Sequence, residues 1–173
     1  DAEGPVVGEP VLGFEGSSDE IDEEIREVFV EEVQEEISNL DSLLPVWAVD
    51  LQNMDQLKPI RRVFHTLKGS GRLVGALTLG EFSWKVENML NRVLDKTIQP
   101  SESVYALIGH AQRTLPKLLA ALRGETGVHA DIEGIKLVAD QLAAGEQIWY
   151  VPPSAAVAEP EGRFEAEPGE AEI

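Results

Sequence analysis

Apolar residues recur at three- and four-residue spacing along most of the chain, which is the pattern of amphipathic helices. A first helix is predicted after a capping box formed by Ser17 and Glu20, and Pro45 is expected to kink or end it. Its apolar positions are Ile21, Ile25, Val28, Phe29, Val33, Ile37, Leu40 and Leu44. A second helix starts near Asp55 or Pro59. Its apolar positions are Leu57, Ile60, Phe64, Leu67 and Val74.

Three further helices are predicted downstream. The third begins at a second capping box, made by Thr78 and Glu81. Its apolar positions are Leu79, Phe82, Val86, Leu90, Val93 and Leu94. The fourth opens near Ser101 and stops at Gly124. Its apolar positions are Val104, Leu107, Ile108, Ala111, Leu115, Leu118, Leu119 and Leu122. A shorter fifth helix spans about 131–144, with apolar positions Ile132, Ile135, Val138 and Leu142.

No stretch alternates between apolar and polar residues for long enough to indicate a strand. The fold class predicted is therefore all-α, an antiparallel four-helix bundle with an additional C-terminal helix. Residues 1–17 are rich in Gly and Pro and are expected to be a flexible linker, and 18–147 to be the helical domain. Residues 148–173 are rich in Pro, Ala and Glu, which predicts a second, acidic linker.

Charge is distributed unevenly along this chain, whose formal net charge is −18. Residues 56–80 contain no Asp or Glu and carry a charge of +5, so the remainder carries −23. The basic residues of this stretch are Lys58, Arg61, Arg62, Lys68 and Arg72. An acidic protein repels nucleic acid and anionic membranes, so neither is expected as a partner. The basic stretch instead predicts a site for one anionic group.

Composition also limits which reactions the protein could carry out and where in the cell it is expected. The chain has no cysteine, which excludes disulfides and thiol nucleophiles. No apolar run approaches the roughly 18–20 residues that cross a bilayer, and the N-terminal stretch lacks the features of a signal peptide. We therefore expect a cytoplasmic protein without membrane insertion. Because the first residue is not Met, we expect a piece of a longer chain.

His65 is the candidate reactive residue. It follows Phe64, a core position, and one residue of helix is a rotation of about 100°, so its side chain is expected outside the core. The residues three and four positions away on its own face are Arg61, Arg62, Lys68 and Gly69, with Arg72 beyond. An accessible imidazole would then be surrounded by cations and would face bare backbone at Gly69.

A phosphoryl group on His65 would explain this arrangement, because imidazole is a nucleophile near neutral pH and Lys68 could reach the phosphoryl oxygens. Glycine inside a helix costs about 1 kcal/mol relative to alanine. The predicted helix contains Gly69, Gly71 and Gly75, and clearing space for an incoming active site would explain that cost. The alternative is an ordinary surface histidine on a solvated basic face. A nucleotide-binding loop is disfavoured because the spacing is G-x-G-x-x-x-G and no strand precedes it.

The stretch "HTLKGSGRLVG", residues 65–75, resembles the phosphorylation motif of histidine phosphotransfer (Hpt) domains. It matches H-x-[apolar]-K-G-[small]-[small]-x-x-[apolar]-G at every position. The similarity is to the chemotaxis type found at the front of histidine kinases. With "ENMLNRVLD" it is especially similar to Hpt modules in the large hybrid kinases of type IV pilus chemosensory systems, which act in twitching motility.

The resemblance implies roles for individual residues. His65 would be phosphorylated on Nε2, and Lys68 would support the phosphoryl group. Glu87, in "VENML", would hydrogen-bond the other ring nitrogen and orient His65. From their place on the His65 face, and apart from the resemblance, Arg61, Arg62, Gly69 and Arg72 are expected to contact the docking partner. Chemotaxis-type members often have a second histidine one turn before the glutamate, where this chain has Trp84, so their kinetics cannot be carried over.

The function predicted is a phosphoryl carrier in two-component, chemosensory signalling. His65 would accept a phosphoryl group from a kinase domain or a receiver and pass it to receiver aspartates of response regulators. We expect a monomeric module of a histidine kinase polypeptide, without its own ATP-binding catalytic domain. The module itself needs no cofactor, and partner domains would supply ATP and Mg²⁺.

Two alternatives from other classes stay open: an Hpt-like adaptor that binds receivers or scaffold proteins without phosphotransfer, and a plain helical assembly domain. No metal site is predicted, because His110 and His129 have no partners at ligand spacing. The acidic residues Glu27, Glu31 and Glu35 are interpreted as a solvated helix face.

Overall fold

The computed structural model describes residues 7–15 and 23–153, which form five helices and two short strands. In chain order these are β1 (Glu9–Pro10), α1 (Glu23–Ala48), α2 (Met54–Leu73), α3 (Leu77–Leu94), α4 (Glu102–Leu122), β2 (His129–Ala130) and α5 (Ile132–Ala143). The prediction of an all-α fold is confirmed, and the strands add only one two-residue antiparallel pairing.

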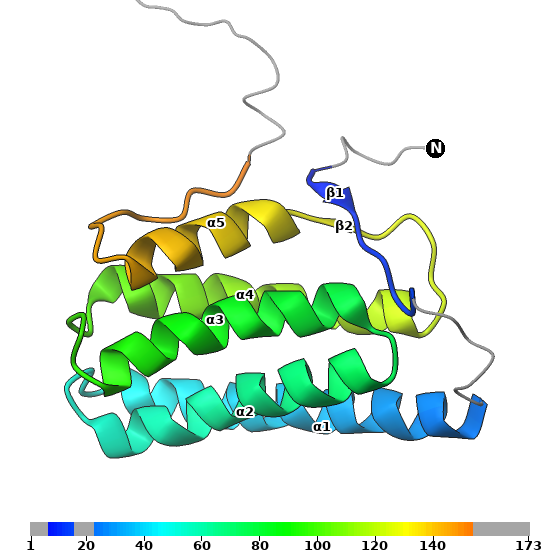
Figure 1. Cartoon of the computed structure of the whole chain (residues 1–173), viewed down its shortest axis with the longest axis horizontal. Helices are drawn as coiled ribbons and strands as arrows, with labels where there is room; N and C mark the ends of the chain where they lie inside the picture. Colours follow the sequence, from blue (N-terminus) through cyan, green and yellow to red (C-terminus); the bar gives the residue numbers. More distant parts are fainter. Residues whose placement is uncertain (1–6, 16–22, 154–173) are drawn as a thin grey trace, which may run out of the picture.

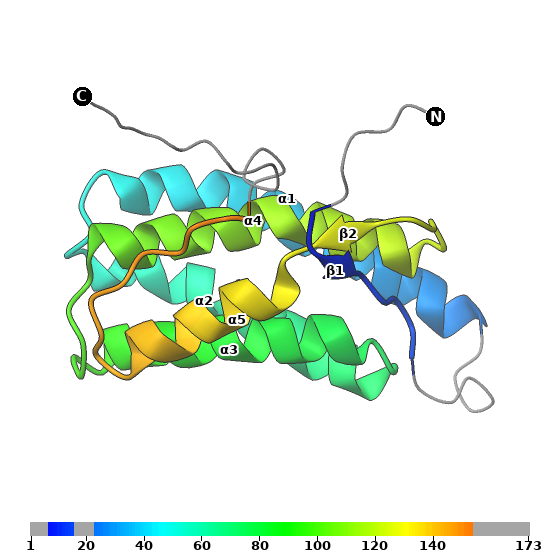
Figure 2. The ribbon, with the colours of Figure 1, turned by 90° about the horizontal axis from the view of Figure 1, so that it is seen from above.

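Helices α1–α4 lie side by side with their long axes in a common direction (Figure 1). In the view of Figure 1, α2 and α3 lie in front of α1 and α4, and Figure 2 shows the same two layers from above. Helix α5 lies over α3 and α4 on one side of this assembly and contacts both. The pairing of α2 with α3 is the most extensive in the protein, and this pair carries the candidate site.

The core is formed by the apolar positions that helical spacing predicted. All predicted core residues of α2, α4 and α5 are buried, including Phe64, and so are Leu79, Phe82, Val86, Leu90 and Val93 of α3. On α1 the predicted positions from Phe29 onward are buried, whereas Ile25 and Val28 are exposed. Ser17, Glu20 and Ile21, which were predicted to begin this helix, lie outside the described residues.

Proline interrupts the helices less than expected. Helix α1 continues through Pro45 to Ala48, so of the two outcomes predicted for Pro45, a kink or an end, the end is wrong. Proline removes one backbone donor, but Leu44 and Trp47 on either side of it are buried in the core and hold this last turn in place. The second helix begins at Met54, and the Asn53 side chain accepts a hydrogen bond from the Gln56 amide at its start.

The start of α3 corrects the second predicted capping box. The helix begins at Leu77, one residue before Thr78, and no side chain at its N-cap makes a capping bond. The carboxylate of Glu15 instead accepts a hydrogen bond from the Thr78 backbone amide, at 2.7 Å. This partner lies 63 residues earlier in the sequence, so local capping rules could not identify it.

Both predicted linkers include residues that pack on the helices. Glu9 and Pro10 pair with Ala130 and His129, and the Glu9 carboxylate accepts from the backbone amide of Glu133 in α5 at 2.8 Å. At the other end, Tyr150 is buried and donates its hydroxyl to Asp131 at 2.8 Å. Parts of both stretches therefore contact the helices.

Candidate functional site

His65 lies on the exposed face of α2, as predicted from its position next to buried Phe64. Its side chain is 56% exposed. The neighbouring α3 presents Glu87 to the same face, and the Glu87 side chain is only 4% exposed. The close packing of α2 on α3 thus places an accessible imidazole directly beside a buried carboxylate.

Three basic side chains surround the Glu87 carboxylate. His65 Nδ1 lies 2.8 Å from Oε2, and Lys68 Nζ lies 2.7 Å from Oε1. A nitrogen of the Arg61 guanidinium, Nη1, lies 3.5 Å from Oε2. Only the contact of Glu87 with His65 was expected, from the family resemblance, and the contacts with Lys68 and Arg61 were not. A buried carboxylate is stable only when it is paired, and here all its partners come from one face of α2.

Glu87 is ionised at neutral pH. Burial pushes its pKa upward, but the hydrogen bonds from Lys68 and His65 outweigh burial and hold the pKa below its ordinary value. An ionised carboxylate can only accept hydrogen bonds, so the Nδ1 atom of His65 must carry a proton. In the neutral imidazole, Nε2 is then the unprotonated nitrogen with a free lone pair.

Gly69, one turn after His65, leaves its surroundings open. A Cβ atom built on it would meet no atom of the described chain within 4 Å. The prediction that glycine keeps the approach to His65 clear agrees with this geometry. Gly75, which was expected inside the helix, lies in the turn between α2 and α3 with φ +85°, a conformation that glycine adopts without strain.

A family model described as the Hpt domain matches residues 24–125, more than half of the chain. The chain belongs to the Hpt domain family. Domains of this family carry out histidine phosphotransfer in phosphorelay signalling, where they interact with kinases and receiver domains. Searches of curated proteins and of solved structures gave no match.

The remaining basic residues predicted for docking differ in their surroundings in this Hpt domain. Arg62 is exposed and lies near Glu36 of α1. Burial raises the pKa of the Glu36 carboxyl above its ordinary value, and the charge of Arg62 opposes this rise only weakly. Arg72 is exposed, and its guanidinium carbon lies 5.6 Å from the centre of the Trp84 ring. Arg61 and Arg72 therefore belong to the His65 face, and Arg62 faces the acidic helix α1.

Other candidate residues lie apart from His65. His110 packs its ring against Tyr150, with 4.7 Å between ring centres, and burial lowers its pKa. His129 lies in β2. The residues that the structure describes include no group of three or more His, Asp or Glu side chains able to hold a metal ion. Nor does any described helix combine the length and the apolar character needed to cross a membrane.

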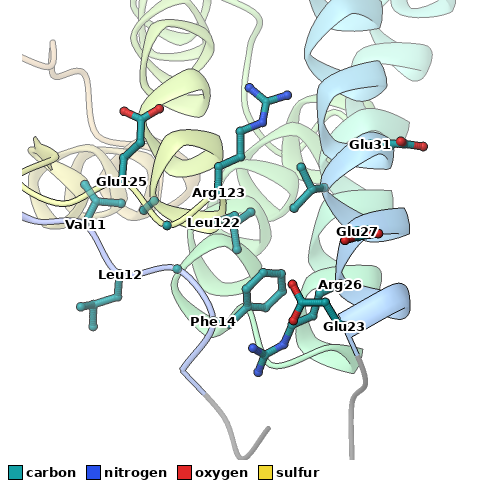
Figure 3. Close-up of a pocket in the computed structure, with 14 residues that line it drawn as sticks. Val11, Leu12, Phe14, Glu23, Arg26, Glu27, Glu31, Leu122, Arg123 and Glu125 are labelled. Atoms are coloured by element: carbon teal, nitrogen blue, oxygen red, sulfur yellow. The ribbon is translucent and has the colours of Figure 1, made fainter.

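A pocket of about 820 Å³ opens between residues 11–14, the start of α1 and the end of α4 (Figure 3). Carboxylates and guanidinium groups line it together; they include Glu23, Glu27, Arg26 and Arg123. Arg26 stacks on the Phe14 ring at 4.6 Å. None of the described residues that line the pocket belongs to the His65 site.

Three contacts around the site were not predicted from the sequence: those of Lys68 and Arg61 with Glu87, and that of Arg72 with Trp84. Spacing along α2 places Arg61 four residues before His65, which was the available signal. The α3 partners could not be assigned, because the rotation of α3 relative to α2 is set by packing.

Proposed function

We propose that His65 is the phosphoacceptor of this Hpt domain. It would take a phosphoryl group from a kinase domain or a receiver and pass it to the aspartate of a response-regulator receiver. The observation that carries the proposal is the contact between His65 Nδ1 and the buried Glu87 carboxylate at 2.8 Å. That contact holds the proton on one ring nitrogen and leaves the other free to attack on an exposed face.

In the transfer step, the lone pair of Nε2 forms a bond to phosphorus. The bond between phosphorus and the donor oxygen breaks, and its electrons leave with the donor, as ADP or as the aspartate carboxylate. The ring gains positive charge while it keeps its Nδ1 proton. Glu87 would stabilise that charge through the existing hydrogen bond, so it is a positioning residue as well as an electrostatic one.

Lys68 and Arg61 would hold the Glu87 carboxylate in place before transfer. Lys68 is three residues from His65 on the same face, and its flexible ammonium group could move from Glu87 to the phosphoryl oxygens once they are present. The predicted role of Lys68 in phosphoryl stabilisation therefore includes a second role in fixing Glu87.

The partners would supply what this domain lacks for a complete reaction. We propose that a kinase domain provides ATP and Mg²⁺, that a receiver provides Mg²⁺ with its acidic pocket, and that the domain itself holds no cofactor. Gly69 and Arg72 would face the docked partner. Arg61 and Arg62 would add positive charge at the edge of this surface.

We also propose a context for the domain. The motif resemblance supports a chemotaxis-type module of a cytoplasmic hybrid kinase, of the kind that serves type IV pilus chemosensory systems. The short connections between successive helices support an antiparallel four-helix arrangement of α1–α4 to which α5 is added. The module is proposed to act as a monomer.

The test is phosphorylation of the full 173-residue chain with phosphoramidate, followed by detection of acid-labile, base-stable phosphate. The wild-type chain should be labelled and His65→Gln should not, while both stay folded because the His65 side chain is exposed. His110→Gln is the control and should be labelled like wild type. Labelled phosphate retained in His65→Gln would contradict the proposal, and a wild-type chain that binds receivers without any labelling would indicate an adaptor.

A further inference from the structure

Trp84 has an unusual position for a large aromatic residue. Its side chain is 38% exposed, although it lies one turn before buried Glu87 on the same helix. Two cations flank the ring: Lys85 Nζ lies 4.4 Å from the ring centre, and the Arg72 guanidinium carbon lies 5.6 Å from it. Cations at these distances are attracted to the face of an indole ring.

The cations that flank Trp84 are themselves held in place. Lys85 forms an ion pair with Asp140 of α5 at 3.0 Å, which ties the ring to a third helix. Arg72 crosses α3 above Gly80, where a Cβ atom would lie 3.0 Å from the Arg72 Cγ atom. Glycine at position 80 therefore lets the arginine side chain lie flat across α3 and reach Trp84.

A continuous stripe on α3 connects Trp84 with the reactive site. Leu77, Gly80, Trp84 and Glu87 follow each other at three- and four-residue spacing, so they share one face of the helix. Leu77 is 47% exposed. This face adjoins the exposed face of α2, and both helices lie at the front of the molecule in Figure 1.

We infer that Arg72, Leu77 and Trp84, here called the docking surface, recognise the partner's receiver domain and set its affinity, without acting in the chemistry at His65. The inference rests on the proposed function and names which residues select the partner. Two exposed apolar side chains together with an arginine suit a protein surface that combines apolar and acidic groups. The acidic pocket of a receiver fits this description.

Charge favours an acidic occupant of the docking surface. Within the described residues no carboxylate lies at ion-pair distance from Arg72, although the chain as a whole carries a net charge of −18. Trp and Arg are the residue types that contribute most to affinity when they are buried at the centre of an interface. A small phosphodonor would need only the His65 site and would not contact Leu77 or Trp84.

The experiment separates recognition from chemistry with the full chain. His65 is phosphorylated with phosphoramidate, and transfer to a receiver domain that accepts phosphate from the wild-type chain is followed at increasing receiver concentration. Trp84→Ala should raise the receiver concentration for half-maximal rate by about tenfold or more, with the rate at saturation and phosphoramidate labelling within about twofold of wild type. Trp149→Ala is the matched control, because Trp149 is also exposed but lies by the α3–α4 connection and the end of α5. It should change neither quantity.

A second measurement does not depend on transfer. Trp47 is fully buried, so Trp149→Phe leaves Trp84 as the exposed indole, and Trp84→Phe leaves Trp149. The unphosphorylated receiver domain should protect the fluorescence of Trp149→Phe from acrylamide quenching and should not protect Trp84→Phe. Wild-type half-saturation in Trp84→Ala, a loss confined to the saturated rate, or equal quenching in both variants would overturn the inference. Absence of labelling in the wild-type chain would instead overturn the proposed function.

Discussion

Gly69 and Gly71 are two residues apart on α2 and have opposite surroundings. A Cβ atom on Gly69 would meet open space, whereas one on Gly71 would lie 3.2 Å from the backbone oxygen of Ala76 and 3.3 Å from the backbone nitrogen of Gly80. Glycine thus leaves room for a partner to approach on one face of the helix, and it lets α3 pack closely on the other face.

Other residues of α2 show the same division between an exposed face and a packed face. The exposed face carries His65 and Lys68, which act together with Glu87. The packed face carries Ile60, Phe64 and Leu67, which are fully buried. If this division holds, substitutions on the packed face should change the free energy of unfolding, and substitutions on the exposed face should change phosphoryl transfer. The predictions below test it in order of their expected effect on stability.

Gly71→Ala should cause the largest loss of stability. The contacts at 3.2 and 3.3 Å involve backbone atoms, which cannot move aside as a flexible side chain could, so α2 and α3 must shift apart. Overpacking of this kind typically costs about 1–3 kcal/mol, and replacing a helical glycine gains roughly 1 kcal/mol, so the net loss should reach about 2 kcal/mol. Urea unfolding should show the decrease. A variant as stable as wild type would mean that the helices are less tightly packed here.

Glu87→Gln should affect both faces, because the carboxylate is buried between the helices and also orients His65. Loss of a group that stabilises charge developing in a reaction typically slows the reaction about 10²-fold, so phosphoramidate labelling should fall by roughly that factor. The free energy of unfolding at neutral pH should fall by about 1–2 kcal/mol, since the charged hydrogen bonds are lost and the partly exposed cations can regain water. A labelling rate equal to that of wild type would show that Glu87 is purely structural.

The pH dependence of this loss has a definite sign. The pKa of Glu87 in the folded protein lies below its ordinary value of 4.5, so the unfolded chain takes up the proton first as pH falls. The stabilisation is therefore complete above about pH 4.5 and disappears as pH falls through the lowered folded-state pKa. The difference in unfolding free energy between wild type and Glu87→Gln should shrink below pH 4.5. Glu81→Gln, an exposed glutamate of the same helix, is the control and should show little change.

The helices and their buried stripes could be predicted because a helix places every third or fourth residue on the same side. The motif identified His65 and Lys68 for the same reason, since both lie on one helix. The burial of Glu87 could not be predicted in this way, because it depends on the packing of α3 against α2. Its partner His65 lies on α2, 22 residues earlier in the sequence. Gly69 and Gly71 could not be told apart either, because only the packed position of α3 distinguishes them.

Contacts made by the N-terminal segment could not be predicted from the sequence either. Composition predicted linkers on both sides of the domain, but Glu9 and Glu15 supply carboxylates to the first turns of α5 and α3. A glutamate in a stretch rich in Gly and Pro gives no local sign of such a role. Its partners are backbone amides, which every helix offers and which no side-chain pattern marks.

Lys68→Ala should lower stability by about 1 kcal/mol, because Glu87 Oε1 loses its contact with Lys68 while Oε2 keeps its contacts with His65 and Arg61. The rate of labelling should fall several-fold, or the phosphohistidine should decay faster, since the phosphoryl oxygens lose a nearby cation. Time courses of labelling and decay measure both effects. Lys58→Ala is the control, because Lys58 is exposed on the same helix and pairs with Asp55. Identical kinetics in the two variants would leave Lys68 with no role beyond neutralising Glu87.

Gly69→Leu should have the smallest effect on stability, and a favourable one. Leucine replaces glycine in a helix with an intrinsic gain of several tenths of a kcal/mol, up to about 1, and the open space at position 69 imposes no packing cost. The leucine side chain would nevertheless occupy the approach to His65. Transfer from a receiver should therefore fall more than labelling by phosphoramidate, which needs less room.

Melting temperature, phosphoramidate labelling and receiver transfer are measured on the same Gly69→Leu variant, with Gly69→Ala as the intermediate. An unfolded Gly69→Leu would mean that Gly69, like Gly71, serves packing, and normal receiver transfer would mean that the partner does not approach over this part of α2.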